Sequence, residues 1–116
     1  MYRTMLKSKI HRATVTEANL TYEGSITIDA DLLQAADILE HEKVEVLNLN
    51  NGQRLETYAI AGKSKSGIVC LNGAAARGAC PGDLIIIVSY VLLDNEKAKT
   101  LKSKIIKVNA RNRIKN

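Results

Sequence analysis

Residues 43–60, KVEVLNLNNGQRLETYAI, carry the strongest fold signal in the chain. Apolar and polar side chains alternate over 43–49, which is the period of a strand with one buried face. The dipeptide Asn51-Gly52 follows, and this pair is typical of tight hairpin turns because both residues tolerate positive φ. Residues 54–60 then supply the returning strand. The sequence therefore predicts a β-hairpin at the centre of the chain.

Most of the remaining chain also has the pattern of short strands, with few helices. Predicted strands lie at 2–7, 10–18, 25–28, 68–71, 84–93 and 104–108. Helices are expected only over 31–38, where Asp29 or Asp31 can act as the N-cap, and near 95–99. Many short strands with one or two short helices predict a single, mostly-β barrel over residues 1–116.

Composition limits the kind of protein this can be. With four Tyr and no Phe or Trp among 116 residues, the core must be aliphatic, and a core this small often gains stability from oligomerisation. No apolar run approaches the roughly 18 residues of a membrane span, and residues 1–12 lack a signal-peptide pattern. A cytoplasmic protein without a membrane partner is expected. Two Cys and two widely spaced His predict no metal site.

The net charge of +5 is concentrated at one end of the chain. Eight of the 17 Lys and Arg lie within 97–116, which holds no acid, so the rest has nine basic against 12 acidic side chains. A solvated, frayed terminus is the expectation for 97–116. The alternative is a small non-enzymatic barrel that binds nucleic acid or a protein partner, although the chain offers few aromatic rings for base stacking.

The stretch Tyr22-Glu-Gly-Ser25 has the chemistry for backbone self-cleavage. A Ser hydroxyl can attack the carbonyl before it and move the acyl group from nitrogen to oxygen. Gly24 lacks a Cβ, so the chain can adopt the tight geometry that this attack requires. Elimination and hydrolysis would then convert Ser25 into an N-terminal pyruvoyl group. Most Gly-Ser dipeptides are simple turns, so this stretch decides nothing alone.

Two pairs of polar residues lie on predicted strands at spacings that put both members on one face. Lys9 and His11 are two residues apart, and Arg54 and Tyr58 are four apart. An Arg can bind a carboxylate with two hydrogen bonds, and a Tyr hydroxyl can donate a proton. Thr57 should face the other way, so a site shared with Tyr58 requires a bulge or a strand end. Exposed strand residues are the alternative interpretation.

A fourth group is the small-residue segment of residues 72–76, Asn-Gly-Ala-Ala-Ala. Small side chains let a ligand approach backbone N–H groups, which can bind a carboxylate or an oxyanion. A short helical turn packed against a neighbouring element is the other interpretation.

In this order and spacing, these groups resemble the L-aspartate α-decarboxylase family, pyruvoyl-dependent enzymes that make β-alanine for pantothenate biosynthesis. The similarity covers about residues 1–93, and the basic end departs from it. The matching elements are Arg3-Thr4-Met5-Leu6, Lys9, His11, Tyr22-Glu-Gly-Ser25, Asn51-Gly52, Arg54, Thr57-Tyr58-Ala59-Ile60, residues 72–76 and Gly82-Asp83. The resemblance implies a double-psi β-barrel and a homotetramer with active sites between subunits.

The resemblance also implies how the chain matures. The precursor would cleave between Gly24 and Ser25, giving a β chain of residues 1–24 and an α chain of residues 25–116. The pyruvoyl group derived from Ser25 would form an imine with the amine of L-aspartate and accept the electrons left by CO₂ loss. The matching Tyr58 would be the proton donor. Whether maturation is spontaneous or needs a helper protein stays open.

The remaining site residues are assigned by the same resemblance. Thr57 would assist cleavage and contact substrate, while Lys9 and Arg54 would hold the substrate carboxylates. The substrate pocket would be lined by Asn72, Gly73, Ala74 and Ala75, with His11, Tyr22 and Ala76 as further candidates. A relative that prefers another acidic amino acid, such as glutamate, is a third possibility.

Overall fold

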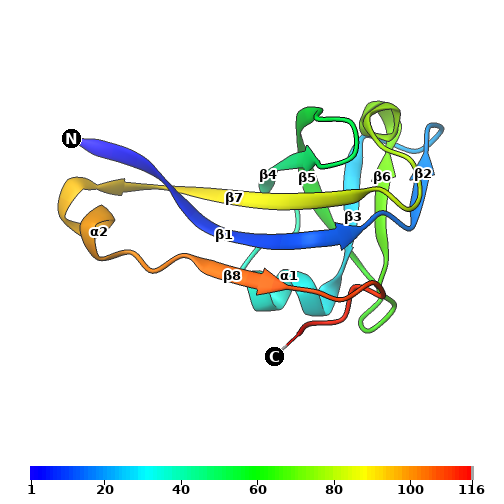
Figure 1. Cartoon of the computed structure of the whole chain (residues 1–116). Coiled ribbons are helices and arrows are strands. Elements are labelled where there is room, and N and C mark those ends of the chain that lie inside the picture. Colours follow the sequence, from blue (N-terminus) through cyan, green and yellow to red (C-terminus); the bar gives the residue numbers. More distant parts are fainter. Residues whose placement is uncertain (116) are drawn as a thin grey trace.

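The computed structural model describes residues 1–115, and its longest feature is an antiparallel pair of strands (Figure 1). The strands of this pair are β1 (Tyr2–Thr14) and β7 (Leu84–Asp94). The shorter strands are β2 (Glu17–Asn19), β3 (Ser25–Asp29), β4 (Lys43–Asn48), β5 (Arg54–Gly62), β6 (Val69–Asn72) and β8 (Lys104–Lys107). The helices are α1 (Ala30–Ala36), the 3-10 helix η1 (Gly73–Gly78) and α2 (Asn95–Thr100).

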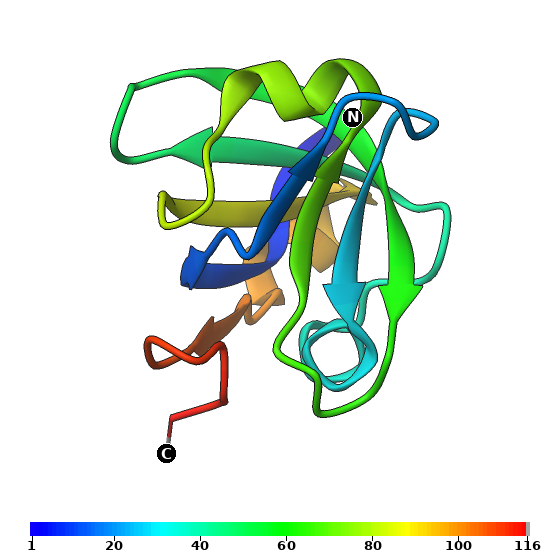
Figure 2. The same ribbon diagram turned by 90° about the vertical axis from the view of Figure 1, so that its right-hand side faces the viewer.

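Strands that are distant in sequence pair in this fold. The order across the sheet is β2-β6-β3-β5-β4-β7-β1-β8, and three neighbouring pairs, β2 with β6, β3 with β5 and β1 with β8, are parallel. In Figure 2 the cyan and green strands β3, β5 and β6 cross the direction of β4 and β7. Parallel pairing needs crossover connections. The predicted mostly-β fold with two short helices is confirmed, and its crossovers agree with the expected double-psi barrel.

The predicted central hairpin is confirmed with small changes at its ends. Strands β4 and β5 pair antiparallel, with Val46 opposite Leu55, and Gly52 in the turn has a φ of +75°. The predicted strands 2–7 and 10–18 are instead one long strand followed by short β2. Strand β1 bends at two irregularities in its register, and Arg12 adopts a φ of +63° beside the second of them. The bend explains why a single alternating pattern does not run through the whole strand.

The core is aliphatic, as the composition predicts. Side chains from strands on both sides of the barrel meet α1, whose buried face consists of Leu32, Leu33 and Ala36. The largest fully buried apolar side chains are Ile10, Val15, Ile26, Ile28, Leu32, Val44, Val46, Val69, Leu71, Ile85 and Ile87.

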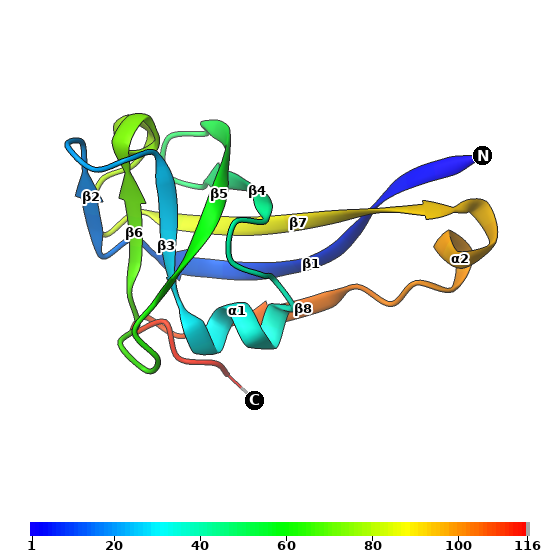
Figure 3. The ribbon, with the colours of Figure 1, turned by 180° about the vertical axis from the view of Figure 1, so that it is seen from behind.

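The expectation of a frayed C-terminal end is wrong for the described residues. Strand β8 pairs parallel with β1, with Ile105 opposite Lys9, and it passes beside α1 (Figure 3). Beyond β8, Asn112 is 1% exposed and its Nδ2 donates to the carbonyl oxygens of Thr14 and Gly67, both at 2.8 Å. These long-range bonds hold the end of the chain against the barrel.

Within residues 1–115, no helix has both the length and the apolar character needed to cross a lipid bilayer. The longest helix, α1, has seven residues.

Asp29 joins β3 to α1 and is the N-cap of α1. The sequence alone allowed either Asp29 or Asp31 at this position. Its carboxylate is 2% exposed and accepts from the backbone N–H groups of Asp31 at 2.9 Å, Gly67 at 2.8 Å and Lys65 at 3.1 Å. One side chain therefore fixes the helix start and the loop before β6.

We expect Asp29→Ala to lower the free energy of unfolding by roughly 2–4 kcal/mol, because buried N–H groups lose a charged acceptor and the cap is lost. Urea unfolding followed by circular dichroism measures this change. Asp31→Ala is the matched control, since Asp31 accepts only from the hydroxyl of Ser64 at the surface. If Asp29→Ala lowers the free energy of unfolding no more than Asp31→Ala does, the role of Asp29 as the cap of α1 is contradicted.

Candidate active site

Ser25 is buried beside Asn72, as the site predicted from the sequence requires. Ser25 begins β3 and lies opposite Asn72, the last residue of β6, and the two side chains are 1% and 3% exposed. The Nδ2 of Asn72 donates to the Ser25 Oγ at 2.9 Å. The Ser25 hydroxyl in turn donates to the carbonyl oxygen of Glu23 at 3.4 Å. The hydroxyl is thus held next to the peptide bond that it would attack.

Gly73 allows the segment around the predicted cleavage point to pack directly on the start of η1. Its φ is +61°, a conformation that favours glycine. A Cβ at this position would lie 2.7 Å from the Gly24 nitrogen, 2.8 Å from the Gly24 Cα and 2.8 Å from the Tyr22 carbonyl oxygen. A side chain here would displace the Gly24 backbone.

The need for glycine therefore lies at a different position from the one that the sequence suggested. Gly24 does not have a positive φ, and a Cβ added there meets no atom within 4 Å. The tight geometry attributed to Gly24 is instead provided by Gly73, across the β3–β6 pair.

Residues 73–76 form the start of the short helix η1, with Asn72 at its N-cap, and a short helical turn was one of the two interpretations of this segment. Ala75 and Ala76 are buried at 8% and 7% exposure, whereas Ala74 is exposed. The first N–H groups of a helix have no partner within it. Because η1 begins against Gly24, these groups start beside the predicted cleavage point.

Thr57 and Tyr58 lie where the pairing of β3 with β5 ends. The terminal pair of this ladder is Ile26 with Ala59, and Gly24 and Thr57 each lie two residues before it in sequence. The two side chains alternate: Thr57 is half-buried, whereas Tyr58 is 36% exposed, with its ring edge-on to His41 at 6.2 Å between centroids. Strand β5 continues regularly from Arg54 to Gly62, so in the described structure neither the bulge nor the strand end expected for a shared site lies at these two residues.

Arg54 shares the outer face of β5 with Tyr58, as predicted, but it makes a surface contact. Its Nη1 lies 4.0 Å from the Glu45 Oε1, and its side chain is 65% exposed. Glu45 also accepts from the Tyr90 hydroxyl at 3.0 Å, and burial together with this bond raises the pKa of Tyr90. A surface ion pair at this distance contributes little stability, so the guanidinium is available to a ligand.

Lys9 and His11 lie half-buried on one face of β1, as their spacing predicts. Burial lowers the pKa of His11, and the neighbouring cations Lys9 and Arg12 lower it further. Within the described part of one chain, no hydrogen bond or ion pair connects either residue to Ser25. The structure therefore brings Ser25, Asn72 and Gly73 together beside Gly24. Within the described residues, no side-chain hydrogen bond or ion pair joins Thr57 or the β1 pair to them.

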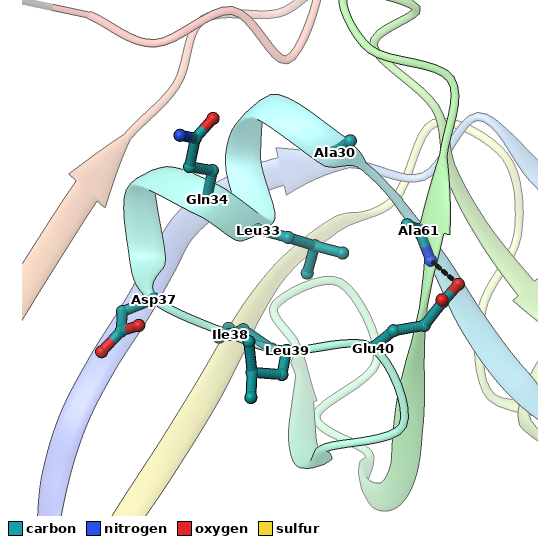
Figure 4. Close-up of a pocket in the computed structure, with 8 residues that line it drawn as sticks. All are labelled: Ala30, Leu33, Gln34, Asp37, Ile38, Leu39, Glu40 and Ala61. Atoms are coloured by element: carbon teal, nitrogen blue, oxygen red, sulfur yellow. Dashed lines mark hydrogen bonds between the residues drawn. The ribbon is translucent and has the colours of Figure 1, made fainter.

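A separate hollow beside α1 contains none of these residues. It is lined by Ala30, Leu33, Gln34, Asp37, Ile38, Leu39, Glu40 and Ala61, and the Glu40 carboxylate closes one side by accepting from the Ala61 N–H at 2.9 Å (Figure 4). Its lining is mostly apolar and it lies away from the cleavage point.

Two residues that the sequence analysis did not assign to the site contact Asn72. The Asn72 Nδ2 also donates to the Thr27 Oγ1 at 3.0 Å, and the Asn72 Oδ1 lies 3.2 Å from the Cys70 Sγ. Cys70 is buried in β6, at 4% exposure. The alternation of a strand could have revealed both, because Thr27 is two residues from Ser25 and Cys70 is two residues from Asn72.

Residues 1–115 match the family model described as aspartate decarboxylase. The chain belongs to the aspartate decarboxylase family. The aspartate 1-decarboxylase of Acetivibrio thermocellus is 62% identical over 116 residues, which is all of this chain and 92% of that protein. Those of Pelotomaculum thermopropionicum and Bacillus licheniformis are 60% and 58% identical, each over 98% of this chain and over 86% and 90% of their own lengths.

Family membership confirms the resemblance drawn from the motifs and makes the chain an enzyme, a carbon–carbon lyase. A non-enzymatic barrel that binds nucleic acid or a protein partner is not favoured. The match also extends beyond the predicted 1–93, because it includes the basic C-terminal residues up to 115.

Proposed function

We propose that this chain decarboxylates L-aspartate to β-alanine and CO₂ after cutting its own backbone between Gly24 and Ser25. The observation that carries the cleavage step is the buried Ser25 Oγ, held by the Asn72 amide at 2.9 Å. The Gly24 backbone beside it packs on Gly73. The candidate nucleophile and its target bond thus contact two consecutive residues, Asn72 and Gly73, and Asn72 is 47 positions from Ser25 in sequence.

The cleavage can be written with balanced atoms. The Ser25 Oγ attacks the Gly24 carbonyl carbon, the carbon–nitrogen bond breaks, and the hydroxyl proton passes to the nitrogen, which leaves an ester. Loss of the Ser25 Cα proton then expels the Gly24 carboxylate. Water replaces the freed nitrogen, which leaves as ammonia, and a pyruvoyl group remains at position 25. Thr57, two residues before the Ala59 that pairs with Ile26, is our candidate to donate a hydrogen bond to the Gly24 carbonyl oxygen as charge develops.

The surroundings of residue 25 fit a pyruvoyl group. An Asn72 amide that donates to an oxygen at position 25 can serve a hydroxyl or a carbonyl equally well. The Asn72 side chain does not cap η1, and Gly73 at the start of this helix packs against Gly24. A pyruvoyl group supplies an electron sink for the carbanion that CO₂ loss leaves behind.

Substrate binding requires cations, because aspartate carries two carboxylates. Arg54 and Lys9 are the assigned pair, yet within the described part of one chain no contact joins them to Ser25. We infer that subunits assemble into a homotetramer and that its active sites combine residues of two subunits. Exposed apolar side chains on β1 and β7, including Tyr2 at 68% and Leu92 at 64%, are suited to such contacts. His11 and Tyr22 stay candidates for the same site.

Tyr58→Phe is expected to leave backbone cleavage unchanged but to lower kcat by about 10²-fold, the low end for loss of a general acid. The phenol is partly exposed and its ring packs edge-on to His41, a contact that Phe retains. Mass spectrometry measures cleavage, and CO₂ release measures turnover. Tyr90→Phe is the control, since it removes a hydroxyl bonded to Glu45 on a neighbouring strand. Unchanged turnover in Tyr58→Phe would remove this residue from the proposed role.

Denaturing mass spectrometry of the purified protein, combined with CO₂ release from L-aspartate, tests the proposal as a whole. We expect fragments of 24 and 92 residues, the larger with the mass of a pyruvoyl end. Parallel assays with L-glutamate test the substrate, and we expect L-aspartate to be preferred. A chain that stays intact while it releases CO₂ would contradict the proposal. The cytoplasmic location stays a prediction.

A further inference from the structure

The Asn72 side chain is the centre of a buried hydrogen-bond network that joins β3 to β6. Its Nδ2 donates to the Ser25 Oγ at 2.9 Å and to the Thr27 Oγ1 at 3.0 Å. Its Oδ1 lies 3.2 Å from the Cys70 Sγ and is placed to accept the thiol proton, while the Leu71 carbonyl oxygen lies at 3.9 Å and the Glu17 carboxylate is a further acceptor near the thiol. Cys70, Asn72 and Ser25 are at most 4% exposed. The amide therefore uses both donors and its acceptor inside the protein.

The strand register explains why these side chains meet. In the antiparallel pairing of β3 with β6, Thr27 lies opposite Cys70 and Ser25 lies opposite Asn72. Residues two apart on a strand point to the same face, so the four side chains form one patch. The proposed cleavage mechanism gives roles to Ser25 and Asn72 but none to Thr27 and Cys70.

The orientation of the Asn72 amide decides what the Ser25 hydroxyl can do. With the nitrogen toward Ser25, the Oγ accepts a hydrogen bond and keeps its own proton for the Glu23 carbonyl. With the amide rotated by half a turn, its oxygen would face Ser25 and draw the hydroxyl proton toward itself. That orientation would also aim the NH₂ group at the Cys70 sulfur, which is a weak acceptor. Thr27 supplies an acceptor for the second N–H, and Cys70 supplies a donor for the oxygen.

We propose that Thr27 and Cys70 are positioning residues for backbone cleavage, which hold the Asn72 amide with its nitrogen toward Ser25. The inference depends on the proposed self-cleavage and adds two residues to it. Neither residue touches the reacting atoms, so each acts through Asn72. The hydroxyl of Thr27 and the thiol of Cys70 are the groups that matter, not their volumes.

The test compares variants that remove the polar group with variants that keep one. Thr27→Val and Cys70→Ala remove it, whereas Thr27→Ser and Cys70→Ser retain a hydroxyl. Each full-length chain is made by cell-free translation, and the uncut fraction is followed over time by denaturing mass spectrometry. We expect cleavage to slow about tenfold in Thr27→Val, because one buried N–H of Asn72 loses its acceptor. We expect a smaller effect in Cys70→Ala, because a thiol is a weak donor. Both Ser variants should stay within about threefold of the parent rate, since each keeps the hydrogen bond.

A purely structural role is separated by measuring the thermal midpoint of each variant in the uncut Ser25→Ala background. We expect the slow variants to remain folded at the assay temperature, so that the rate reports on the site. The inference would be overturned if Thr27→Val and Cys70→Ala cleave at the parent rate, or if the Ser variants cleave as slowly as these two. Either result would leave the proposed self-cleavage intact. A parent chain that never cleaves would overturn the proposed function and this inference with it.

Discussion

Ser25→Ala is expected to give a single uncut chain of 116 residues with no decarboxylase activity. The substitution removes the one atom, Oγ, that attacks the Gly24 carbonyl, and without cleavage no pyruvoyl group can form. The fold should survive, because Ala fits the buried position and the loss of one hydrogen bond to Asn72 costs only about 1 kcal/mol. Denaturing mass spectrometry and CO₂ release measure both outcomes on one sample.

Ser8→Ala is the matched control for this experiment. Ser8 is also fully buried on a strand, at 0% exposure, and its Oγ has no hydrogen-bond partner in the described structure. Removing it deletes the same atom from the same kind of environment, away from the cleavage point. We expect normal cleavage and activity in Ser8→Ala. An uncut Ser25→Ala chain that decarboxylates aspartate at the parent rate would rule out a cofactor derived from Ser25.

Local patterns predicted the parts of the fold that local interactions determine. The hairpin of β4 and β5 follows from alternation and from Asn51-Gly52, and α1 follows from its aspartate cap. At the C-terminal end the predicted helix near 95–99 and strand at 104–108 are present as α2 and β8, but the expected fraying is wrong. The order of this end depends on pairing between residues nearly 100 positions apart, such as Lys9 with Ile105. Composition describes such a segment as basic and says nothing about its partner strand.

For the candidate site, the motifs named Ser25, Asn72 and Thr57, and their roles stay a prediction. The pairing of β3 with β6 explains how Ser25 and Asn72, 47 positions apart, come to lie side by side. What the sequence could not show is which glycine the geometry needs. The close approach between η1 and the cleavage segment is a contact across strands, and it makes Gly73 the constrained position.

Gly73→Ala is therefore expected to slow backbone cleavage by at least about 10²-fold, because small displacements of reacting groups have effects of this size. The new Cβ would lie less than 3.0 Å from two backbone atoms of Gly24 and from the Tyr22 carbonyl oxygen, so the segment before Ser25 must move. Decarboxylase activity should fall in proportion, since only cleaved chains carry the cofactor. The uncut fraction over time, read by denaturing mass spectrometry, measures the effect.

Gly52→Ala separates this displacement from simple backbone strain. Gly52 has a φ of +75°, close to the +61° of Gly73, but a Cβ there meets no atom within 4 Å. Both substitutions therefore carry a similar conformational penalty of roughly 1–2 kcal/mol, while only Gly73→Ala adds a clash. If both variants lose stability but only Gly73→Ala fails to cleave, packing against Gly24 is what positions the bond. Equal cleavage rates in the two variants would mean that Ser25 still attacks the Gly24 carbonyl after the Gly24 backbone has moved. The contact between Gly73 and Gly24 would then contribute to the fold and not to cleavage.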